Sequence, residues 1–168
     1  MFAPDLTGKA MRLIDTCRRK QLMLATAESC TGGLIAGLIT SVAGSSDVFD
    51  AGFVTYSNAA KTAMIGVPED LIARLGAVSE DVARAMAVGA IRHSRADIAV
   101  AVTGIAGPGG GSASKPVGLV HCTAARRGCE IHHLELQLGD IGRDAIRLAT
   151  VVQAIEMAYA LALASGEP

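Results

Sequence analysis

A short cluster of carboxylate, hydroxyl and thiol side chains, Glu28 to Gly33 with the sequence ESCTGG, is the strongest candidate for chemistry in this chain. It follows the apolar run 22–27 and precedes the apolar segment 34–40, a pattern that predicts a buried strand turning into a helix. Such a junction gathers backbone N–H groups and hydroxyls, which bind a phosphate or a developing oxyanion. The structural alternative is that Ser29 or Thr31 only caps the helix.

Three arrangements of nucleophile and base are open at this point. Ser29 with Lys61 would be a Ser-Lys pair. Cys30 with Lys61 and an acid such as Glu28 would be a thiol amidohydrolase site, because a thiolate is a strong nucleophile. The segment 112–115, SASK, has the S-x-x-K form of the β-lactamase class, but a loop of small residues ahead of a proline is a poor place for the helix that this form needs.

In the first two arrangements Lys61 must be neutral to accept a proton. The reference pKa of lysine is about 10.4, so a base that works near neutral pH needs a pKa roughly three below that value. An ionised Glu28 beside Lys61 would oppose this change, so we expect Glu28 to orient an amide or a water instead. Tyr56 can donate to an oxyanion or share in the proton transfer. The structural alternative for Lys61 is a solvated lysine on a surface helix.

The segment 104–111, GIAGPGGG, holds five of the 19 glycines of the chain. A G-x-G-x-x-G register that starts at Gly107 meets Ser112 where the last glycine belongs, and no G-x-x-x-x-G-K-[ST] motif is present. The segment is therefore neither a Rossmann nor a Walker motif. We expect a donor-rich loop beside the first cluster, with Thr103 at its base, or simply a connection that needs positive φ angles.

The histidines and cysteines do not form a metal-binding pattern. His132 and His133 are adjacent on a predicted strand and so point to opposite faces. The four cysteines have no C-x-x-C spacing, and no basic stretch followed by an apolar run marks a signal peptide. We therefore expect no metal ion, free thiols and a cytoplasmic protein.

The composition excludes several classes of protein. With 168 residues, 51% of them hydrophobic, and a formal net charge of -1, the sequence predicts one folded domain over residues 1–168 and excludes a disordered chain. The balanced charge and the absence of Trp argue against nucleic-acid binding, and the charge also argues against a membrane surface. No apolar run approaches the length of a bilayer span. We read the surplus of hydrophobic residues as a sign of a homo-oligomer interface.

Predicted strands and helices alternate along the chain. We expect helices over 5–20, 34–40 and 143–163, and strands over 22–27, 52–57, 97–102, 117–125 and 129–138. We also expect two shorter helices, one capped by Asn58 and containing Lys61 and one capped by Ser79. In the last helix, the predicted buried stripe is Ala145, Leu148, Val152, Ile155 and Tyr159.

This order of elements predicts an α/β fold. We expect a three-layer α/β/α sandwich, with a mixed, mostly parallel sheet and an antiparallel hairpin at its edge. Ligands of such sheets bind outside the carboxyl ends of the strands. Both the cluster at Glu28 and the glycine-rich loop follow strand ends, so we expect them to form one site.

Several motifs in the same order resemble the CinA carboxy-terminal domain family, over nearly the whole chain. They are Thr26-Ala-Glu-Ser-Cys-Thr-Gly-Gly33, Gly44-Ser-Ser46, Gly52-Phe-Val-Thr-Tyr-Ser-Asn58 with Lys61, Gly76-Ala-Val-Ser79, Thr103-Gly-Ile-Ala-Gly-Pro108 and Lys115-Pro-Val-Gly118. The resemblance implies hydrolysis of the carboxamide of nicotinamide mononucleotide (NMN) to nicotinate mononucleotide and ammonia, in pyridine nucleotide salvage. It also implies a Ser-Lys mechanism without metal or cofactor, and not the activity of the pyrophosphatase-like domain of full-length CinA.

By position, the resemblance implies that Ser29, Lys61 and Tyr56 are catalytic. The residues implied to bind the substrate are Glu28, Cys30, Thr31, Gly32, Gly33, Thr103, Gly104, Gly107 and Arg143. Arg143 would hold the phosphate, because a guanidinium binds phosphate oxygens in pairs. The competing interpretation is a nucleotide-binding or regulatory module that keeps the fold without the chemistry.

Overall fold

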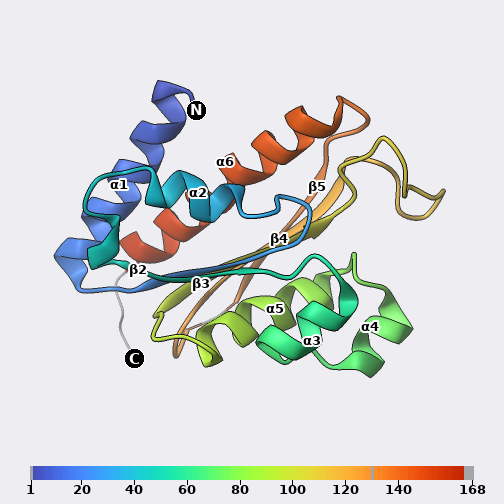
Figure 1. Ribbon diagram of the computed structural model, residues 1–168, viewed down its shortest axis with the longest axis horizontal. Coiled ribbons are helices and arrows are strands. Elements are labelled where there is room, and N and C mark those ends of the chain that lie inside the picture. Colours follow the sequence, from blue (N-terminus) through green and yellow to red (C-terminus); the bar gives the residue numbers. More distant parts are fainter. Residues whose placement is uncertain (1, 130, 165–168) are drawn as a thin grey trace.

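A five-stranded sheet lies between two layers of helices in the computed structural model, which describes residues 2–129 and 131–164 (Figure 1). In spatial order the strands are β2 (Phe49–Val54), β1 (Leu24–Glu28), β3 (Ile98–Gly104), β4 (Leu119–Arg126) and β5 (His132–Gln137). Strand β1 is parallel to both of its neighbours, whereas β4 is antiparallel to β3 and β5. The predicted three-layer fold, with a mixed sheet and an antiparallel hairpin at one edge, is confirmed.

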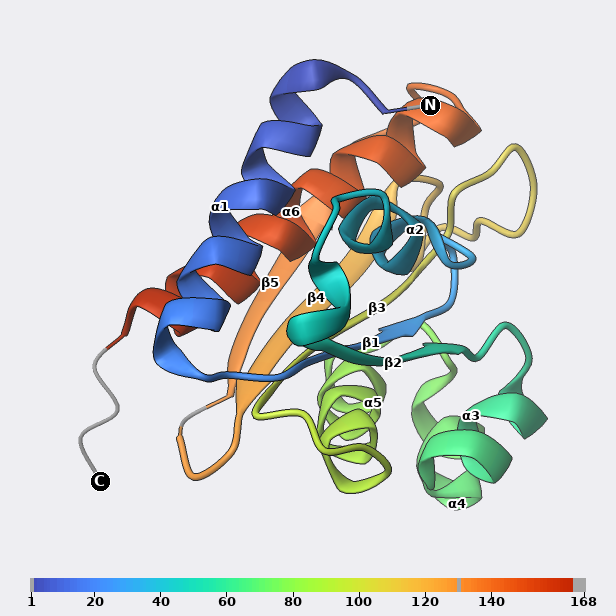
Figure 2. The same cartoon turned by 60° about the vertical axis from the view of Figure 1, so that its left-hand side comes forward.

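Each face of the sheet is covered by three helices. Helices α1 (Pro4–Lys20), α2 (Leu34–Thr40) and α6 (Arg143–Leu163) lie on one face, and α3 (Asn58–Ile65), α4 (Glu69–Leu75) and α5 (Glu80–Arg92) on the other (Figures 1 and 2). A short 3₁₀ helix, η1 (Ser45–Asp47), precedes β2. Helix α4, a seven-residue helix between the helix at Lys61 and the one after Ser79, was not predicted.

Alternate residues of the central strands face the two layers. Val100 and Val102 of β3 are buried in the cluster formed with α1, α2 and α6, whereas Ala99 and Ala101 are buried in the cluster beneath α5. On the α5 side the central strands therefore present methyl groups, which let a helix lie close to the sheet. This packing accounts for a core that is rich in alanine and poor in aromatic residues.

The predicted buried stripe of α6 is wrong at its N-terminal end. Ile146 and Thr150 are buried there, whereas Leu148 is 44% exposed and Ala145 is also exposed. The Thr150 hydroxyl donates to the backbone oxygen of Ile146 (2.8 Å), so a polar residue is accommodated inside the helix layer. Hydropathy alone favours leucine over threonine at a buried position. The predicted stripe therefore included Leu148 and not Thr150, which lies part of a helical turn away and faces the core.

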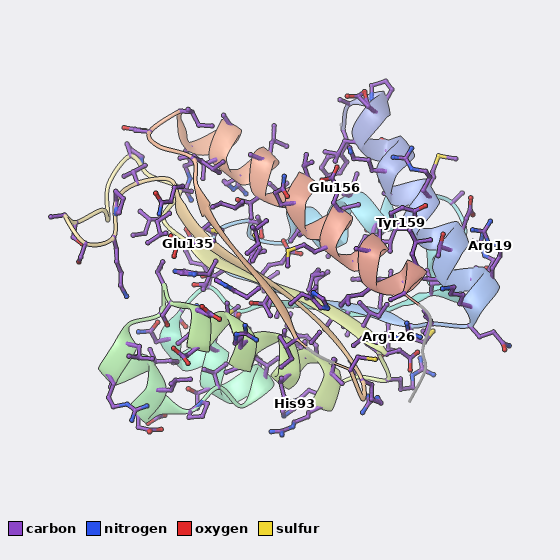
Figure 3. All side chains as sticks on the ribbon, turned by 180° about the vertical axis from the view of Figure 1, so that it is seen from behind. Arg19, His93, Arg126, Glu135, Glu156 and Tyr159 are labelled. Atoms are coloured by element: carbon purple, nitrogen blue, oxygen red, sulfur yellow. The ribbon has the colours of Figure 1, made fainter. Side chains whose placement is uncertain are left out.

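Helix α6 is anchored along the sheet. By length and composition it could cross a membrane, but 44% of its apolar stretch is buried in the fold and it packs on α1, β3 and β4, as the core helix of a folded domain does. Arg126, at the end of β4, donates to the carbonyls of Leu161 and Ala164 at the C-terminal end of the helix (Figure 3). The position of this helix matters because its first two turns reach the candidate site.

Candidate active site

Ser29 and Lys61 are brought together by the pairing of two parallel strands. Ser29 directly follows β1, and Lys61 lies on α3, which follows the neighbouring strand β2. The Ser29 Oγ lies 3.2 Å from the Lys61 Nζ, although the two residues are 32 positions apart in the chain. The prediction of a short helix that contains Lys61 is confirmed, but its N-cap is Ser57 rather than Asn58: the Ser57 Oγ accepts from the N–H of Ala60 at 3.0 Å.

The amine of Lys61 is buried inside the fold. The residue is 1% exposed, and burial lowers the pKa of its amine below the ordinary value of 10.5. Its Nζ donates to the backbone oxygen of Thr55 (2.8 Å), and no carboxylate of the described residues forms an ion pair with it. A neutral amine in this position keeps an N–H for Thr55 and offers its lone pair to the Ser29 hydroxyl. This geometry is that of a general base and its nucleophile.

Glu28 does not face the substrate side of Ser29. Its side chain is fully buried, and its Oε2 accepts from the Thr31 hydroxyl (2.7 Å) and from the N–H groups of Gly33 and Ile35 (both 3.0 Å). Its Oε1 accepts from the N–H of Ala36 at 2.8 Å. The carboxylate therefore caps α2, where it satisfies N–H groups that the helix leaves free. The expected role, orienting an amide or a water, is not the one that the structure gives it.

A cavity of about 240 Å³ opens beside Ser29. Its walls come from three segments: the turn after β1, the loop after β2 and the glycine-rich loop after β3, with the start of α6 closing one side. The lining residues are Ser29, Cys30, Tyr56, Gly104, Ile105, Ala106, Gly107, Gly109, Gly110 and Arg143. The structure thus brings together six of the predicted site residues around one space, with Lys61 buried behind Ser29.

Four other predicted residues do not line this cavity. Thr31 and Thr103 each use their hydroxyl inside the fold; that of Thr103 donates to the backbone oxygen of Ala77 at 2.8 Å. Gly32 and Gly33 form the turn into α2, and Gly33 has a φ of 96°, a conformation that glycine adopts without strain. These residues shape the turn that carries Ser29 rather than the cavity wall.

The N–H groups of this turn differ in what they bind. The N–H of Gly32 donates to the carbonyl of Ser29 (3.1 Å), and that of Gly33 is taken by Glu28. Within the described ranges, the N–H groups of Cys30 and Thr31 have no acceptor. They are therefore the donors of this turn that remain available for a developing oxyanion.

Arg143, the first residue of α6, crosses the mouth of the cavity. Its Nη2 donates to the Tyr56 hydroxyl (3.1 Å) and its Nη1 to the carbonyl of Gly107 (2.7 Å). Tyr56 is 62% exposed, so its ring lies at the entrance and not in the interior. The guanidinium supplies the positive charge of the cavity wall and has further N–H groups to offer to an anion.

Cys30 lines the cavity but is held as a thiol. It is 5% exposed, and burial raises its pKa to about 11, so the thiolate that a cysteine nucleophile requires is disfavoured at neutral pH. Between Ser29 and Cys30 as the partner of Lys61, the geometry favours Ser29. The S-x-x-K segment is not helical, and the Nζ of Lys115 donates to the carbonyl of Leu75, away from Ser112.

Arg147, which lies one helical turn beyond Arg143, was not predicted as a site residue. Its Nε donates to the carbonyl of Cys30 (3.2 Å) and its Nη2 to that of Thr31 (2.9 Å). The signal available in the sequence was the spacing of four residues between the two arginines, which places both on one face of the helix.

Known proteins match this chain over almost its whole length. The family model of the CinA C-terminal domain matches residues 7–162. The crystal structure of a competence/damage inducible protein from Agrobacterium tumefaciens is 56% identical, covers 96% of this chain and 98% of its own, and superposes with a TM-score of 0.94. A CinA superfamily protein from Escherichia coli is 31% identical, with coverages of 98% and 94% and a TM-score of 0.86.

Among curated relatives, a CinA-like protein of Geobacter sp. (strain M21) is 52% identical over 156 residues. The match covers 92% of this chain and 37% of that relative, so this chain spans little more than a third of its length. The resemblance noted in the sequence is confirmed by these matches, and the chain belongs to the CinA C-terminal domain family.

Proposed function

We propose that this protein hydrolyses the carboxamide of NMN, giving nicotinate mononucleotide and ammonia, in the cytoplasm. The observation that carries the proposal is the hydroxyl of Ser29 at 3.2 Å from the buried amine of Lys61, whose pKa is lowered by its environment. An amide is a poor electrophile, so its hydrolysis requires an activated nucleophile and a donor for the oxyanion. Ser29, Lys61 and the free N–H groups of Cys30 and Thr31 supply these functions.

In the first half of the proposed reaction, Ser29 becomes acylated. The Oγ attacks the carboxamide carbon, its proton passes to the neutral amine of Lys61, and the N–H of Thr31 donates to the oxyanion. The tetrahedral intermediate then collapses: the C–N bond breaks, and the leaving nitrogen takes the proton from Lys61 and departs as ammonia. Tyr56 lies at the entrance, where its hydroxyl accepts from Arg143.

In the second half, a water molecule takes the place of ammonia. Lys61 accepts a proton from the water as it attacks the acyl carbon, and returns that proton to the Ser29 Oγ as the acyl bond breaks. The nicotinate product carries the oxygen of the water, and the serine and the lysine regain their starting states. No further reactant is needed, because the sum is amide plus water to carboxylic acid plus ammonia.

The rest of the cavity suits a nucleotide with one phosphate. Arg143 provides a charged fork, and the loop 104–110 provides backbone N–H groups beside it. A single phosphate needs only such a local set of donors, which agrees with the net charge of -1 for the whole chain. The nicotinamide ring would lie between Ser29 and Tyr56, with no tryptophan to stack on it.

The test is release of ammonia from NMN by the purified protein, measured together with the appearance of nicotinate mononucleotide. The expected result is turnover that is lost in Ser29→Ala. Nicotinamide riboside and the dinucleotide NAD, tried in parallel, define the substrate range. If NMN binds in calorimetry but releases no ammonia, the domain is the regulatory module considered above and the proposal is wrong.

A further inference from the structure

Arg147 lies outside the turn that carries the nucleophile and forms hydrogen bonds to it. We propose that it is a positioning residue for Ser29: its guanidinium fixes the peptide groups that follow Ser29, and so sets both the direction of the Oγ and that of the oxyanion donor. This inference rests on the proposed amide hydrolysis and adds to it a residue that does not line the cavity.

The hydrogen bonds of Arg147 are made to the backbone and not to another side chain. Two of its nitrogens donate to two consecutive carbonyls, those of Cys30 (3.2 Å) and Thr31 (2.9 Å). The side chain is 25% exposed, and the carboxylate of Asp144 lies 3.8 Å away, beyond hydrogen-bond distance. The positive charge is therefore directed at the two carbonyls, where charge-assisted hydrogen bonds are stronger than neutral ones.

The hydrogen bond from Arg147 to the carbonyl of Cys30 fixes the direction of the N–H of Thr31 on the opposite side of the turn. The carbonyl of Cys30 and the N–H of Thr31 belong to the same planar trans peptide, so they point in opposite directions. When the guanidinium takes the carbonyl, the N–H must point away from α6. This N–H, like that of Cys30, has no acceptor among the described residues, and a charged donor on the carbonyl also polarises the N–H of the same peptide.

The turn is clamped from two sides. The buried carboxylate of Glu28 holds the Thr31 hydroxyl and the N–H of Gly33 from inside, and Arg147 holds the carbonyls of Cys30 and Thr31 from α6. A side chain at Gly32 would contact the Nη2 of Arg147 at 3.6 Å, so the guanidinium lies directly against the turn. Without Arg147, the carbonyls of Cys30 and Thr31 lose the guanidinium donors, and the contacts of Glu28 on the inner side remain.

Arg143 and Arg147 are therefore expected to act on different kinetic parameters. Arg143 lines the cavity and is placed to bind the substrate, so its loss should raise KM. Arg147 reaches only the backbone behind the nucleophile, so its loss should lower kcat, because a misplaced nucleophile or oxyanion donor weakens binding of the transition state and not of the substrate.

The experiment compares Arg147→Ala and Arg147→Lys with Arg127→Ala. Arg127 is a matched control, because its Nη2 also donates to two backbone carbonyls, those of Ile91 (3.1 Å) and Ala96 (3.0 Å), but far from Ser29. Three quantities are measured: kcat and KM for NMN, the midpoint of thermal unfolding, and the rate at which a fluorophosphonate labels Ser29. In the labelling reaction the Oγ–P bond forms, fluoride leaves and Lys61 takes the proton.

We expect Arg147→Ala to lower kcat about 30-fold with KM changed less than about threefold. This is less than the roughly 100-fold or greater effect of removing an oxyanion donor or of a full misplacement, because here the donor and the nucleophile are loosened and not removed. The labelling rate should fall with kcat, and Arg147→Lys should recover part of both. Arg127→Ala should lower the unfolding midpoint and leave kcat and labelling unchanged.

Two results would overturn the inference. One is wild-type kcat and labelling in Arg147→Ala, and the other is a loss in Arg147→Ala that merely follows its unfolding midpoint and is shared by Arg127→Ala. Failure of the proposed function looks different: the wild-type protein itself then releases no ammonia. In that case the labelling rates of Ser29 still decide whether Arg147 positions it.

Discussion

Lys61 reaches Ser29 from the opposite face of the sheet. The helix that carries Lys61 packs on the α5 side, whereas the turn after Ser29 continues into α2 on the α6 side, and the two side chains meet at the carboxyl edge of β1. Nucleophile and base thus belong to two separately packed layers. The amine is held inside the fold, and this location decides how the pair should respond to substitution and to pH.

Replacement of the two candidate nucleophiles should give opposite results. We expect Ser29→Ala to lower kcat for ammonia release from NMN by at least about 1000-fold, as for other covalent nucleophiles. Cys30→Ala should stay within about threefold of the wild type, because the buried thiol, with a pKa of about 11, does not ionise at neutral pH. Ammonia release and fluorophosphonate labelling measure both effects. An active Ser29→Ala protein and an inactive Cys30→Ala protein would reverse the assignment.

The activity should rise with pH through the pKa of Lys61. The free enzyme needs this amine neutral, and burial lowers its pKa below 10.5, so kcat/KM should have an acid limb at a pH lower than that value. Lys61→Arg should lose activity at every pH, because a guanidinium is not deprotonated in proteins. A profile of kcat/KM against pH checks this. A flat acid side in the wild type, with Lys61→Arg still active, would exclude Lys61 as the base.

The same amine should make the stability of the fold depend on pH. The pKa of Lys61 is lower in the native state than the value of 10.5 that applies when the chain is unfolded. Between these two pKa values the unfolded state binds more protons, so the free energy of unfolding should rise as pH rises through this window. Lys61→Met removes the group. The difference in unfolding free energy between the wild type and Lys61→Met, from urea titrations at several pH values, should therefore increase with pH.

The wild type and Lys61→Met differ only at this position. The contributions of other groups that titrate at high pH therefore cancel in the difference between their unfolding free energies. An unchanged difference from neutral pH to pH 10.5 would mean that Lys61 titrates in the native state as it does in the unfolded chain.

Glu28→Gln should destabilise the fold. The amide keeps the shape of the carboxylate but turns one oxygen into an N–H donor, which then faces backbone or hydroxyl donors. Leaving buried donors without an acceptor, and removing a buried charge that they stabilise, costs about 3 kcal/mol in the free energy of unfolding. Urea unfolding measures it, with Glu69→Gln at the start of α4 as a control expected within about 0.5 kcal/mol of the wild type. Equal stabilities of the two variants would contradict the role of Glu28 as a cap.

Arg143→Ala should remove the preference for a phosphorylated substrate. A charged hydrogen bond contributes about 2 kcal/mol, so KM for NMN should rise about 30-fold while kcat changes little. Nicotinamide riboside lacks the phosphate and serves as the matched substrate, whose kinetics should hardly change. The ratio of kcat/KM for the two compounds is the measured quantity. If the ratio is the same in the variant as in the wild type, the phosphate is bound elsewhere.

The features that could be predicted are those that depend on short stretches of sequence. Strands β1 and β3 are short apolar runs followed by polar residues or glycines, so their order, and the position of Ser29 and of the glycine-rich loop at one edge, could be predicted. The arginine at the start of α6 could be placed for the same reason. Lys61 could be named as a base, but its burial could not, because that depends on the packing of α3 against α5.

What could not be predicted are the contacts to backbone groups of distant segments. The carbonyls that Arg147 and Thr103 use, and the N–H groups that Glu28 caps, have no signature in the sequence. The histidines give another case. His132 and His133 were placed on opposite faces, but the register of the hairpin also brings the His133 Nε2 to 3.0 Å from the Nδ1 of His121, and this register depends on the length of the turn.

The exposed ring of Tyr56 at the cavity mouth gives this protein an optical property. The chain has no tryptophan and two tyrosines, and the other, Tyr159, lies on α6 (Figure 3). Intrinsic fluorescence therefore arises from two rings, one of which touches the guanidinium that we assign to the phosphate. In Tyr159→Phe the tyrosine emission comes from Tyr56 alone. A change in this emission would then report, without a label, whether a ligand occupies the cavity entrance.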